Sequence, residues 1–289
     1  MGMNVGCRTL AFADAHGGAD VPVRVFYPTL AEERPVRLGP YAMDLALDGA
    51  PDGERLPLVA ISHGMGGSPL VYRTLAAHLA GAGFVVALPE HPGDNAGDHR
   101  LSGTAVNLEN RPRHLRLAID GLFADAVLGR RLRPGEARLI GHSLGGYTVL
   151  ALAGGRPTCF AAEAEDGRPH AIPVTPDPRV KALVLLAPAT VWFMAPGALA
   201  GVTAPILMLT GEKDVFTPPL HAAIVEAGVA GPVDHRVVAG AGHFAFLSPF
   251  PPEMVRPGFL PSQDPEGFDR ARFVPDLNAQ VTEFLQGTL

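Results

Sequence analysis

The most constraining feature of this 289-residue chain is a tight turn between two apolar segments. Residues 137–140 form a short apolar run typical of a buried strand, and residues 147–153 form one typical of a helix. Between them lies Gly141-His142-Ser143-Leu144-Gly145-Gly146. Because a strand and a helix joined this closely nearly touch, the positions two before and two after the serine must be small. The sequence therefore predicts a strand–turn–helix unit with Ser143 at its tip.

Strand-like and helix-like segments alternate from residue 55 onward. Short, almost wholly apolar runs are typical of strands covered on both faces, and they occur at 56–62 and 84–88. Further strands are expected at 137–140, 180–187, 206–209 and 233–238. Segments with helical spacing lie between or after them, at 68–81, 115–128, 147–153, 220–226 and 277–285. This alternation favours an α/β fold with a mostly parallel central sheet flanked by helices on both faces.

The N-terminal part follows a different pattern. Alternation of Val21, Val23, Val25 and Tyr27 with other residues predicts antiparallel edge strands. Residues 31–54 are rich in proline, glycine and charge, so we expect a loop with one helical turn near 43–47. Further long loops are expected at 92–111 and 155–179.

Composition excludes several function classes. The chain is 47% apolar with a net charge of −6, which predicts a globular core rather than disorder. An acidic balance with scattered lysine and arginine argues against nucleic acid as the main partner. The two cysteines, Cys7 and Cys159, make neither a disulfide framework nor a zinc site. We expect no metal and no organic cofactor.

Length alone suggests about two domains, but the 34 glycines and 29 prolines are spread along the chain rather than gathered into a linker. We therefore expect one domain over residues 1–289. No apolar run approaches the roughly 20 residues that cross a bilayer. Residues 1–10 lack the basic and apolar stretches of a secretory signal, which a processed start would hide. A cytoplasmic protein is expected, and the oligomeric state stays open.

Ser143 is the candidate nucleophile. The motif G-x-S-x-G exposes a serine hydroxyl on a strained turn near a helix N-terminus, whose amides favour developing negative charge. A glycine-rich turn can carry the same letters by chance, but the flanking strand and helix favour the catalytic interpretation.

A serine hydroxyl needs a base within hydrogen-bond reach, and the base needs an acid to orient it. Chains with this motif carry them in the order serine, acid, histidine. Asp214 lies at the tip of the turn after the strand at 206–209, whereas Glu212 lies nearer the strand. Among eleven histidines, His243 alone follows both the serine and an acid after a late strand. The predicted catalytic residues are therefore Ser143, Asp214 and His243.

Acyl transfer also requires preorganised amides that stabilise the oxyanion. One should come from Leu144, which follows the nucleophile, and the other from the glycine-rich segment after the first buried strand. Within Ser62-His63-Gly64-Met65-Gly66-Gly67 we choose Met65, because the surrounding glycines let the backbone lie against a ligand. His63 and His91 end strands and are expected at the edge of the site.

Together these motifs resemble the α/β-hydrolase superfamily over residues 55–289. Within it, the chain resembles the dienelactone-hydrolase-like group, which includes platelet-activating-factor acetylhydrolase-like esterases. The closer likeness rests on four short segments. They are Pro-Glu-His-Pro-Gly at 89–93, Asn-Arg-Pro-Arg at 110–113, Asp-Pro-Arg-Val-Lys-Ala at 177–182 and His-Phe-Ala-Phe-Leu at 243–247. Dienelactone hydrolases use cysteine where this chain has Ser143, which favours a general ester. The resemblance implies a helical cap after the sixth strand, but residues 188–204 are too few to form a large one. A roof over the site is therefore expected from loops 92–111, 155–179 and 245–262.

The sequence thus predicts a serine esterase that cleaves small-molecule carboxylic esters with short to medium chains. The candidate residues for the substrate pocket are His63, His91, Trp192, Phe193, Phe244 and Phe246. Two alternatives remain open. One is an amidase, peptidase or thioesterase acting on a biosynthetic intermediate, and the other is a non-catalytic binding protein on the same fold.

Overall fold

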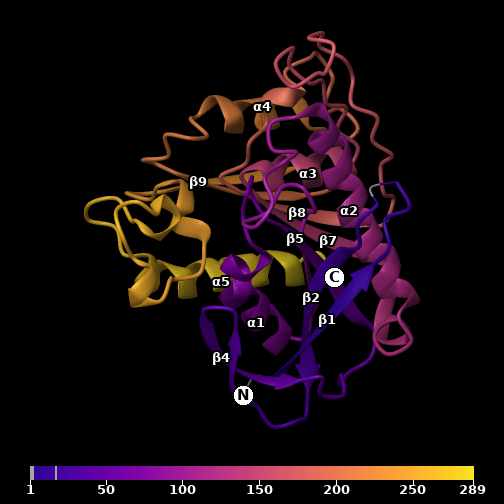
Figure 1. Ribbon diagram of the computed structural model, residues 1–289, viewed down its shortest axis with the longest axis vertical. Helices are drawn as coiled ribbons and strands as arrows, with labels where there is room; N and C mark the ends of the chain where they lie inside the picture. The colour runs from indigo at the N-terminus through magenta and orange to yellow at the C-terminus, as the bar shows by residue number, and fades with distance from the viewer. Residues whose placement is uncertain (1–2, 17) are drawn as a thin grey trace.

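In the described part of the chain, ten strands form one sheet, whose central strands lie in the middle of the protein (Figure 1). The computed structural model describes residues 3–16 and 18–289. The strands are β1 (Asn4–Phe12), β2 (Val21–Thr29), β3 (Arg34–Leu38), β4 (Tyr41–Leu47), β5 (Leu56–Ser62), β6 (Val85–Pro89), β7 (Leu132–His142), β8 (Val180–Leu186), β9 (Ile206–Gly211) and β10 (Val233–Val238). They follow the order β10-β9-β8-β7-β5-β6-β2-β1-β4-β3. Strands β5 to β10 pair in parallel, whereas β2 pairs antiparallel with both β6 and β1. The predicted parallel sheet with antiparallel N-terminal strands is confirmed.

Helices cover both faces of this sheet (Figure 1). They are α1 (Arg73–Gly81), α2 (Ala105–Ala124), α3 (Leu144–Leu152), α4 (Leu220–Gly228) and α5 (Arg270–Gln286). The buried side chains of α2, α3 and α4 belong to one apolar cluster. Those of α1 and α5 belong to a second cluster on the opposite face. Within the described residues, none of these helices combines the length and apolarity needed to cross a bilayer.

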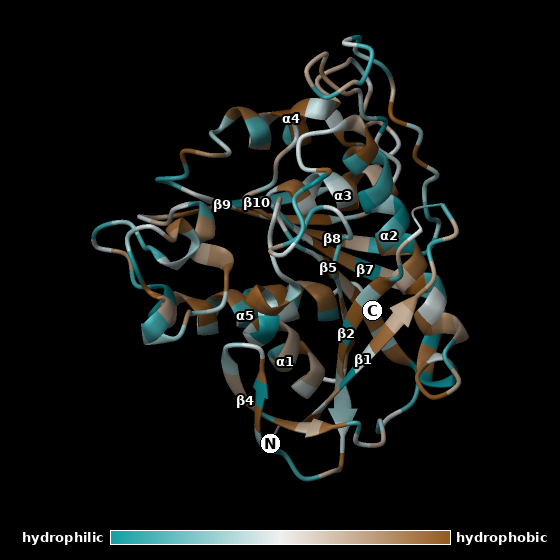
Figure 2. Ribbon diagram, in the orientation of Figure 1, coloured by the Kyte–Doolittle hydropathy of each residue, from teal (hydrophilic) through white to brown (hydrophobic). Residues whose placement is uncertain are grey.

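The central strands are apolar because both of their faces are covered. Every residue of β5 is buried, as are the last five residues of β8. Figure 2 shows hydrophobic central strands between helices that carry hydrophilic residues on their outer sides. Parallel strands β5, β7, β8 and β9 end at one edge of the sheet, so the segments after them gather there.

Residues 31–54 form a hairpin rather than the expected loop with a helical turn. Strands β3 and β4 pair antiparallel around a turn at Gly39 and Pro40, where Gly39 has a φ of 58°. Strand β4 then adds in parallel to β1. The turn residues and the partner strand decide the conformation, whereas the proline and charge content suggested a loop.

Helix α2 begins inside the expected loop 92–111. The Thr104 side chain caps it by accepting the amide hydrogen of Asn107 at 3.1 Å. Pro112 lies within the helix and has no amide hydrogen for the Leu108 carbonyl. The Tyr147 hydroxyl donates to that carbonyl instead, at 2.9 Å. A tertiary contact therefore satisfies the carbonyl oxygen that Pro112 leaves without a donor inside the helix.

Two other helices differ in their limits. The expected helix at 68–81 is split into a 3-10 turn, η1 (Pro69–Tyr72), and α1. The closing helix is longer than predicted, because the Asp269 side chain caps it eight residues before 277.

Residues 187–205, between β8 and β9, contain one short 3-10 turn, η3 (Val191–Phe193), in place of a large helical cap.

Candidate active site

Ser143 lies in a strained turn between β7 and α3. Its φ of 54° and ψ of −121° are backbone angles that non-glycine residues seldom adopt. A Cβ on Gly141 would lie 2.2 Å from the Gly145 carbonyl oxygen, and one on Gly145 would lie 2.0 Å from the Ser62 carbonyl oxygen. Backbone atoms cannot move aside as a side chain can, so both positions require glycine. The close approach expected from the spacing is present.

The turn after β9 and the loop after β10 bring Asp214 and His243 together. The His243 ring donates from Nδ1 to Asp214 Oδ2 at 2.8 Å, and both side chains are buried. The Thr217 hydroxyl donates to the same oxygen at 2.7 Å, while the amides of Phe216 and Thr217 donate to Oδ1. Burial favours protonation of Asp214, but these hydrogen bonds and the charge of His243 outweigh it, so its pKa lies below the ordinary value. Asp214 is thus a carboxylate that fixes one ring nitrogen of His243.

Ser143 and His243 line the same cavity. In the described part of the chain, no hydrogen bond joins the Ser143 hydroxyl to the His243 ring, whose Nδ1 faces Asp214 and Thr217. Nucleophile–base hydrogen bonds are often long before substrate binds. Ser143 and His243 are therefore related here by lining one cavity and not by a direct hydrogen bond.

His142 links the Ser143 turn to the His243 loop. Its Nε2 lies 2.9 Å from the His243 carbonyl oxygen, which can only accept, so Nε2 carries the proton. Its Nδ1 then accepts from the Tyr72 hydroxyl at 3.0 Å. Burial lowers the pKa of His142 to about 3, which keeps the ring neutral and this pattern fixed. The residue before the candidate nucleophile therefore holds the backbone of the candidate base.

The two residues expected to supply the oxyanion amides also belong to this site. Met65 and Leu144 both line it. Leu144 is the first residue of α3, so the helix supplies no acceptor for its amide. Among residues 3–16 and 18–289, the Met65 amide donates no hydrogen bond, whereas the Gly66 amide donates to Asp94. Two free donors at one cavity wall suit an anionic oxygen.

The cavity has a volume of about 610 Å³ and is mainly apolar. Of the expected pocket residues, Trp192 and Phe244 line it, as does the half-exposed Met65. Sequence reasoning missed further aromatic lining residues, which come from four separate segments: Tyr41, Tyr72, Phe216, Phe250 and Phe259. Their positions carry no local motif, because only the packing of those segments brings them to the site.

Four expected pocket residues lie behind the cavity wall. His63 and His91 are fully buried. Phe193 stacks on Tyr147 with ring centroids 5.5 Å apart, and Phe246 packs in the core cluster of α1 and α5. Trp192 and Phe193 are neighbours in η3, but only the former faces the cavity, since adjacent residues of a 3-10 turn point in different directions.

The roof also differs from the expected one. Residues of 245–262 line the cavity as expected, but loop 92–111 contributes Ala96 and loop 155–179 contributes no lining residue. The β3–β4 hairpin supplies Pro40 and Tyr41 instead. Arg73 holds this arrangement, because its guanidinium lies 3.9 Å from the Tyr41 ring centroid and donates to the Pro249 carbonyl.

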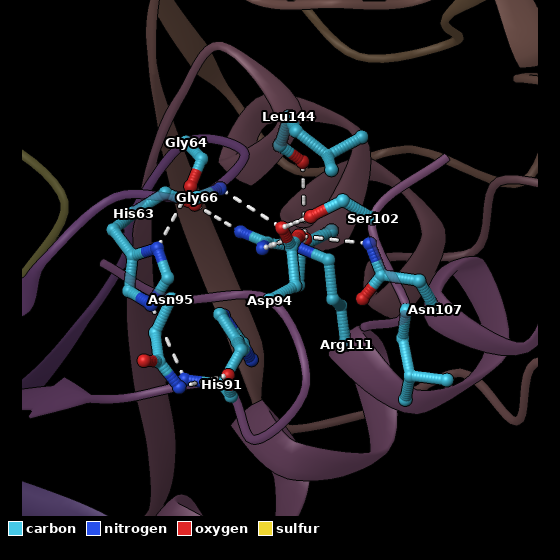
Figure 3. Close-up of polar contacts among 12 residues, drawn as sticks. His63, Gly64, Gly66, His91, Asp94, Asn95, Ser102, Asn107, Arg111 and Leu144 are labelled. Atoms are coloured by element: carbon cyan, nitrogen blue, oxygen red, sulfur yellow. Dashed lines mark hydrogen bonds and ion pairs between the residues drawn. The ribbon is translucent and has the colours of Figure 1, made fainter. Parts of the chain in front are cut away.

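A buried polar cluster lies behind the segment that carries Met65 (Figure 3). Asp94 and Arg111 form an ion pair at 2.7 Å, with neither side chain exposed. Ser102 and Asn107 also donate to Asp94, at 2.6 and 2.8 Å. The sequence singled out the segment around Arg111 only through a family resemblance. Its partner Asp94 lay in an expected loop and gave no signal.

Four buried histidines make the fold sensitive to acid. Burial lowers the pKa of His63 and His142 to about 3 and that of His114 to about 4, and it holds the pKa of His91 well below the ordinary value. In the unfolded chain each titrates near 6.5. Below that pH the unfolded state binds more protons, so stability falls as pH falls, by at most about 1.4 kcal/mol per pH unit for each histidine.

We therefore expect the melting temperature to drop steeply between pH 6.5 and 4. His114→Gln should make this dependence shallower, because the variant removes one of the four groups. His16→Gln, at an exposed position, is the matched control and should keep the wild-type slope. Thermal melts followed by circular dichroism across this range test the prediction, and equal slopes for all three proteins would contradict it.

Comparison with known proteins gives a matching family model, a curated relative and solved structures of similar fold. A family model described as platelet-activating factor acetylhydrolase, isoform II, matches residues 44–117, which include Met65, Asp94 and Arg111 but not Ser143. Cutinase est2 of Thermobifida alba is 28% identical over 192 residues, or 65% of this chain and 52% of the cutinase. The chain thus spans about half the length of the curated relative that it matches.

Two solved structures are similar over almost the whole chain. A ferulic acid esterase from Streptomyces cinnamoneus has a TM-score of 0.73 at 21% identity, covering 99% of this chain and 90% of the esterase. A dienelactone hydrolase from Anabaena variabilis has a TM-score of 0.58 at 17% identity, covering 98% of this chain and 99% of the hydrolase. At such identities the likeness is one of fold.

Proposed function

Because this chain has the α/β-hydrolase fold and resembles its esterase group, we propose that it is a serine hydrolase that cleaves carboxylic esters. Residues 1–289 would act as one domain, with Ser143 as nucleophile, His243 as base and Asp214 as the acid that orients the base. The observation that carries the proposal is one apolar cavity lined by Ser143 on its strained turn and by His243 paired with Asp214.

In the first step, the Ser143 oxygen attacks the ester carbonyl while His243 takes the hydroxyl proton at Nε2. Nε2 is free for this task because Nδ1 is held by Asp214. The carbonyl oxygen becomes an oxyanion, which accepts from the amides of Met65 and Leu144. The ester C–O bond then breaks, and His243 gives its proton to the leaving alcohol.

In the second step, His243 takes a proton from water, and the resulting hydroxide attacks the acyl group on Ser143. The same two amides stabilise the second oxyanion. Collapse breaks the bond between the serine oxygen and the acyl carbon, the proton returns to Ser143, and the carboxylic acid leaves. Asp214 stays ionised and stabilises the imidazolium that forms in each step.

A fluorophosphonate probe tests the proposal directly. Wild-type protein should be labelled at Ser143, as mass spectrometry of the tryptic peptide would show, because only an activated serine attacks phosphorus at a useful rate. Folded protein that is not labelled and turns over no ester would be a binding protein on the same fold. Competition of ester against matched amide and thioester substrates separates the esterase from the amidase and thioesterase alternatives.

A series of esters tests the proposed preference for short to medium chains. Along p-nitrophenyl acetate, butyrate, octanoate and palmitate, each buried methylene contributes about 0.8 kcal/mol, or roughly a fourfold gain in kcat/KM. We expect the gain to stop at medium chains, the range that the sequence predicts. Steady-state rates for this series are the measurement, and a rise that continues to palmitate would point to a lipase instead.

A further inference from the structure

We propose that Arg111 and Asp94 are positioning residues for the oxyanion hole: one buried guanidinium holds both of the segments whose amides receive the oxyanion. The inference rests on the proposed function, since it assigns a task to residues behind the same site. Neither side chain lines the cavity, so neither touches the substrate.

The first branch of this cluster fixes the segment that carries Met65 (Figure 3). Asp94 Oδ1 accepts the amide hydrogen of Gly66 at 2.8 Å. Arg111 Nη2 donates to the carbonyl oxygen of His63. Both anchors lie within two residues of Met65, one on each side. The peptide plane that aims the Met65 amide is therefore held from both ends.

His63 strengthens this branch from inside the segment. Its Nδ1 lies 2.8 Å from the Gly64 carbonyl oxygen, which can only accept, so Nδ1 carries the proton. Its Nε2 accepts from the His91 amide at 3.2 Å. The ring thus joins the start of the segment to the strand end before Asp94, with a single arrangement of its protons.

The second branch fixes the start of α3, which carries Leu144. Arg111 Nε donates to the Thr148 hydroxyl oxygen at 3.1 Å, and that hydroxyl donates to the Leu144 carbonyl oxygen at 3.1 Å. A hydroxyl has one hydrogen, so accepting from Arg111 directs that hydrogen to Leu144. The same guanidinium therefore reaches both sources of the candidate oxyanion donors.

Burial makes the arrangement rigid. The side chains of Arg111 and Asp94 are both 0% exposed, and Asp94 accepts from Arg111, Ser102, Asn107 and the Gly66 amide. A buried ion pair is weak support for stability, because removing two charges from water costs about as much as the pair returns. Preorganised donors, by contrast, act only when their direction is held before charge develops. The contacts of Arg111 and Asp94 therefore fit the preorganisation of the oxyanion donors better than a role in stability.

Four variants test this assignment. Thr148→Val removes the link to Leu144 and leaves the ion pair intact, whereas Thr148→Ser keeps the hydroxyl. Asp94→Asn keeps an acceptor for Gly66 but removes the charge that holds Arg111. Asp14→Asn is the control, because Asp14 is also a buried carboxylate and pairs at 2.8 Å with Arg113, a partly exposed residue of the same helix α2. Neither Asp14 nor Arg113 lines the cavity.

Two quantities are measured for each folded variant. They are kcat and KM for p-nitrophenyl butyrate, and the inhibition constants of a trifluoromethyl ketone and of the parent methyl ketone. The first ketone forms a tetrahedral oxyanion on Ser143, and the second stays largely a ground-state ligand. We expect Thr148→Val and Asp94→Asn to lower kcat about 10- to 100-fold with KM nearly unchanged, and to weaken the trifluoromethyl ketone alone by a similar factor.

Thr148→Ser and Asp14→Asn should keep wild-type values of both quantities. Unchanged kcat and unchanged ketone selectivity in folded Thr148→Val and Asp94→Asn would overturn the assignment. If Asp94→Asn does not fold, Thr148→Val decides alone, since it leaves every charge in place. Wild-type protein that neither cleaves esters nor reacts with the fluorophosphonate would instead overturn the proposed function, which separates the two failures.

Discussion

Replacing Ser143 by alanine should lower ester turnover by about 10⁴-fold or more while the protein stays folded. The substitution removes only the Ser143 hydroxyl group, so the Asp214–His243 pair and the cavity remain. Turnover then falls to what water can do against a carbonyl in the same site, with the oxyanion donors still present. The measurement is kcat for p-nitrophenyl butyrate, together with loss of fluorophosphonate labelling.

Ser143→Gly is the informative companion to this variant. Its turnover should be equally low, but its stability should exceed that of Ser143→Ala by about 1 kcal/mol, because glycine adopts a φ of 54° without strain. Melting temperatures of the two inactive variants would show the difference. An alanine variant that kept a tenth of the wild-type rate would remove Ser143 from the mechanism.

Asp214→Asn should reduce kcat by about 10³- to 10⁴-fold with little change in structure. The reason is that the two carboxylate oxygens of Asp214 accept from different donors. The amides of Phe216 and Thr217 donate to Oδ1 at 2.8 and 2.9 Å, so the carboxamide oxygen must take that place. The NH₂ group then faces His243 Nδ1, which becomes an acceptor, and Nε2 carries the proton. A base protonated at Nε2 cannot accept the proton of Ser143.

Glu212→Gln is the matched control for Asp214→Asn. Glu212 lies on the same turn after β9, but its carboxylate accepts from the Gly240 amide rather than from His243. Its variant should keep wild-type kcat. Stopped-flow measurement of the nitrophenolate burst would show whether Asp214→Asn slows acylation, as the tautomer argument requires. Equal losses in the two variants would mean that general destabilisation of the turn, and not the tautomer, causes the effect.

Local sterics explain why the turn at Ser143 could be predicted. The spacing of Gly141 and Gly145 around the serine encodes a contact between a strand and a helix that follow each other directly, so the constraint lies within a few adjacent residues. The positions of Asp214 and His243 could be predicted for another reason: each follows a late strand, and parallel strands end at one edge of the sheet.

Local composition misled where a distant partner decides the outcome. Residues 31–54 have the composition of a loop, yet β3 and β4 form a hairpin that reaches the cavity roof, and β4 pairs with β1. Helix α2 contains Pro112, yet Tyr147 supplies the hydrogen bond that the proline cannot. In both cases the compensating group, β1 or Tyr147, is distant in the sequence from the segment that it stabilises. The sequence of that segment therefore does not indicate it.

The amino-acid sequence by itself determined the alternating α/β architecture, the strained position of Ser143 and the segments that carry Asp214 and His243, because each depends on local spacing or on order along the chain. Tertiary structure alone decided which aromatic residues line the cavity, and it paired Arg111 with Asp94 and with Thr148, 17 and 37 positions away. Hydrogen bonds and burial depend on distance in space, which a linear pattern does not record until the sheet brings its loops together.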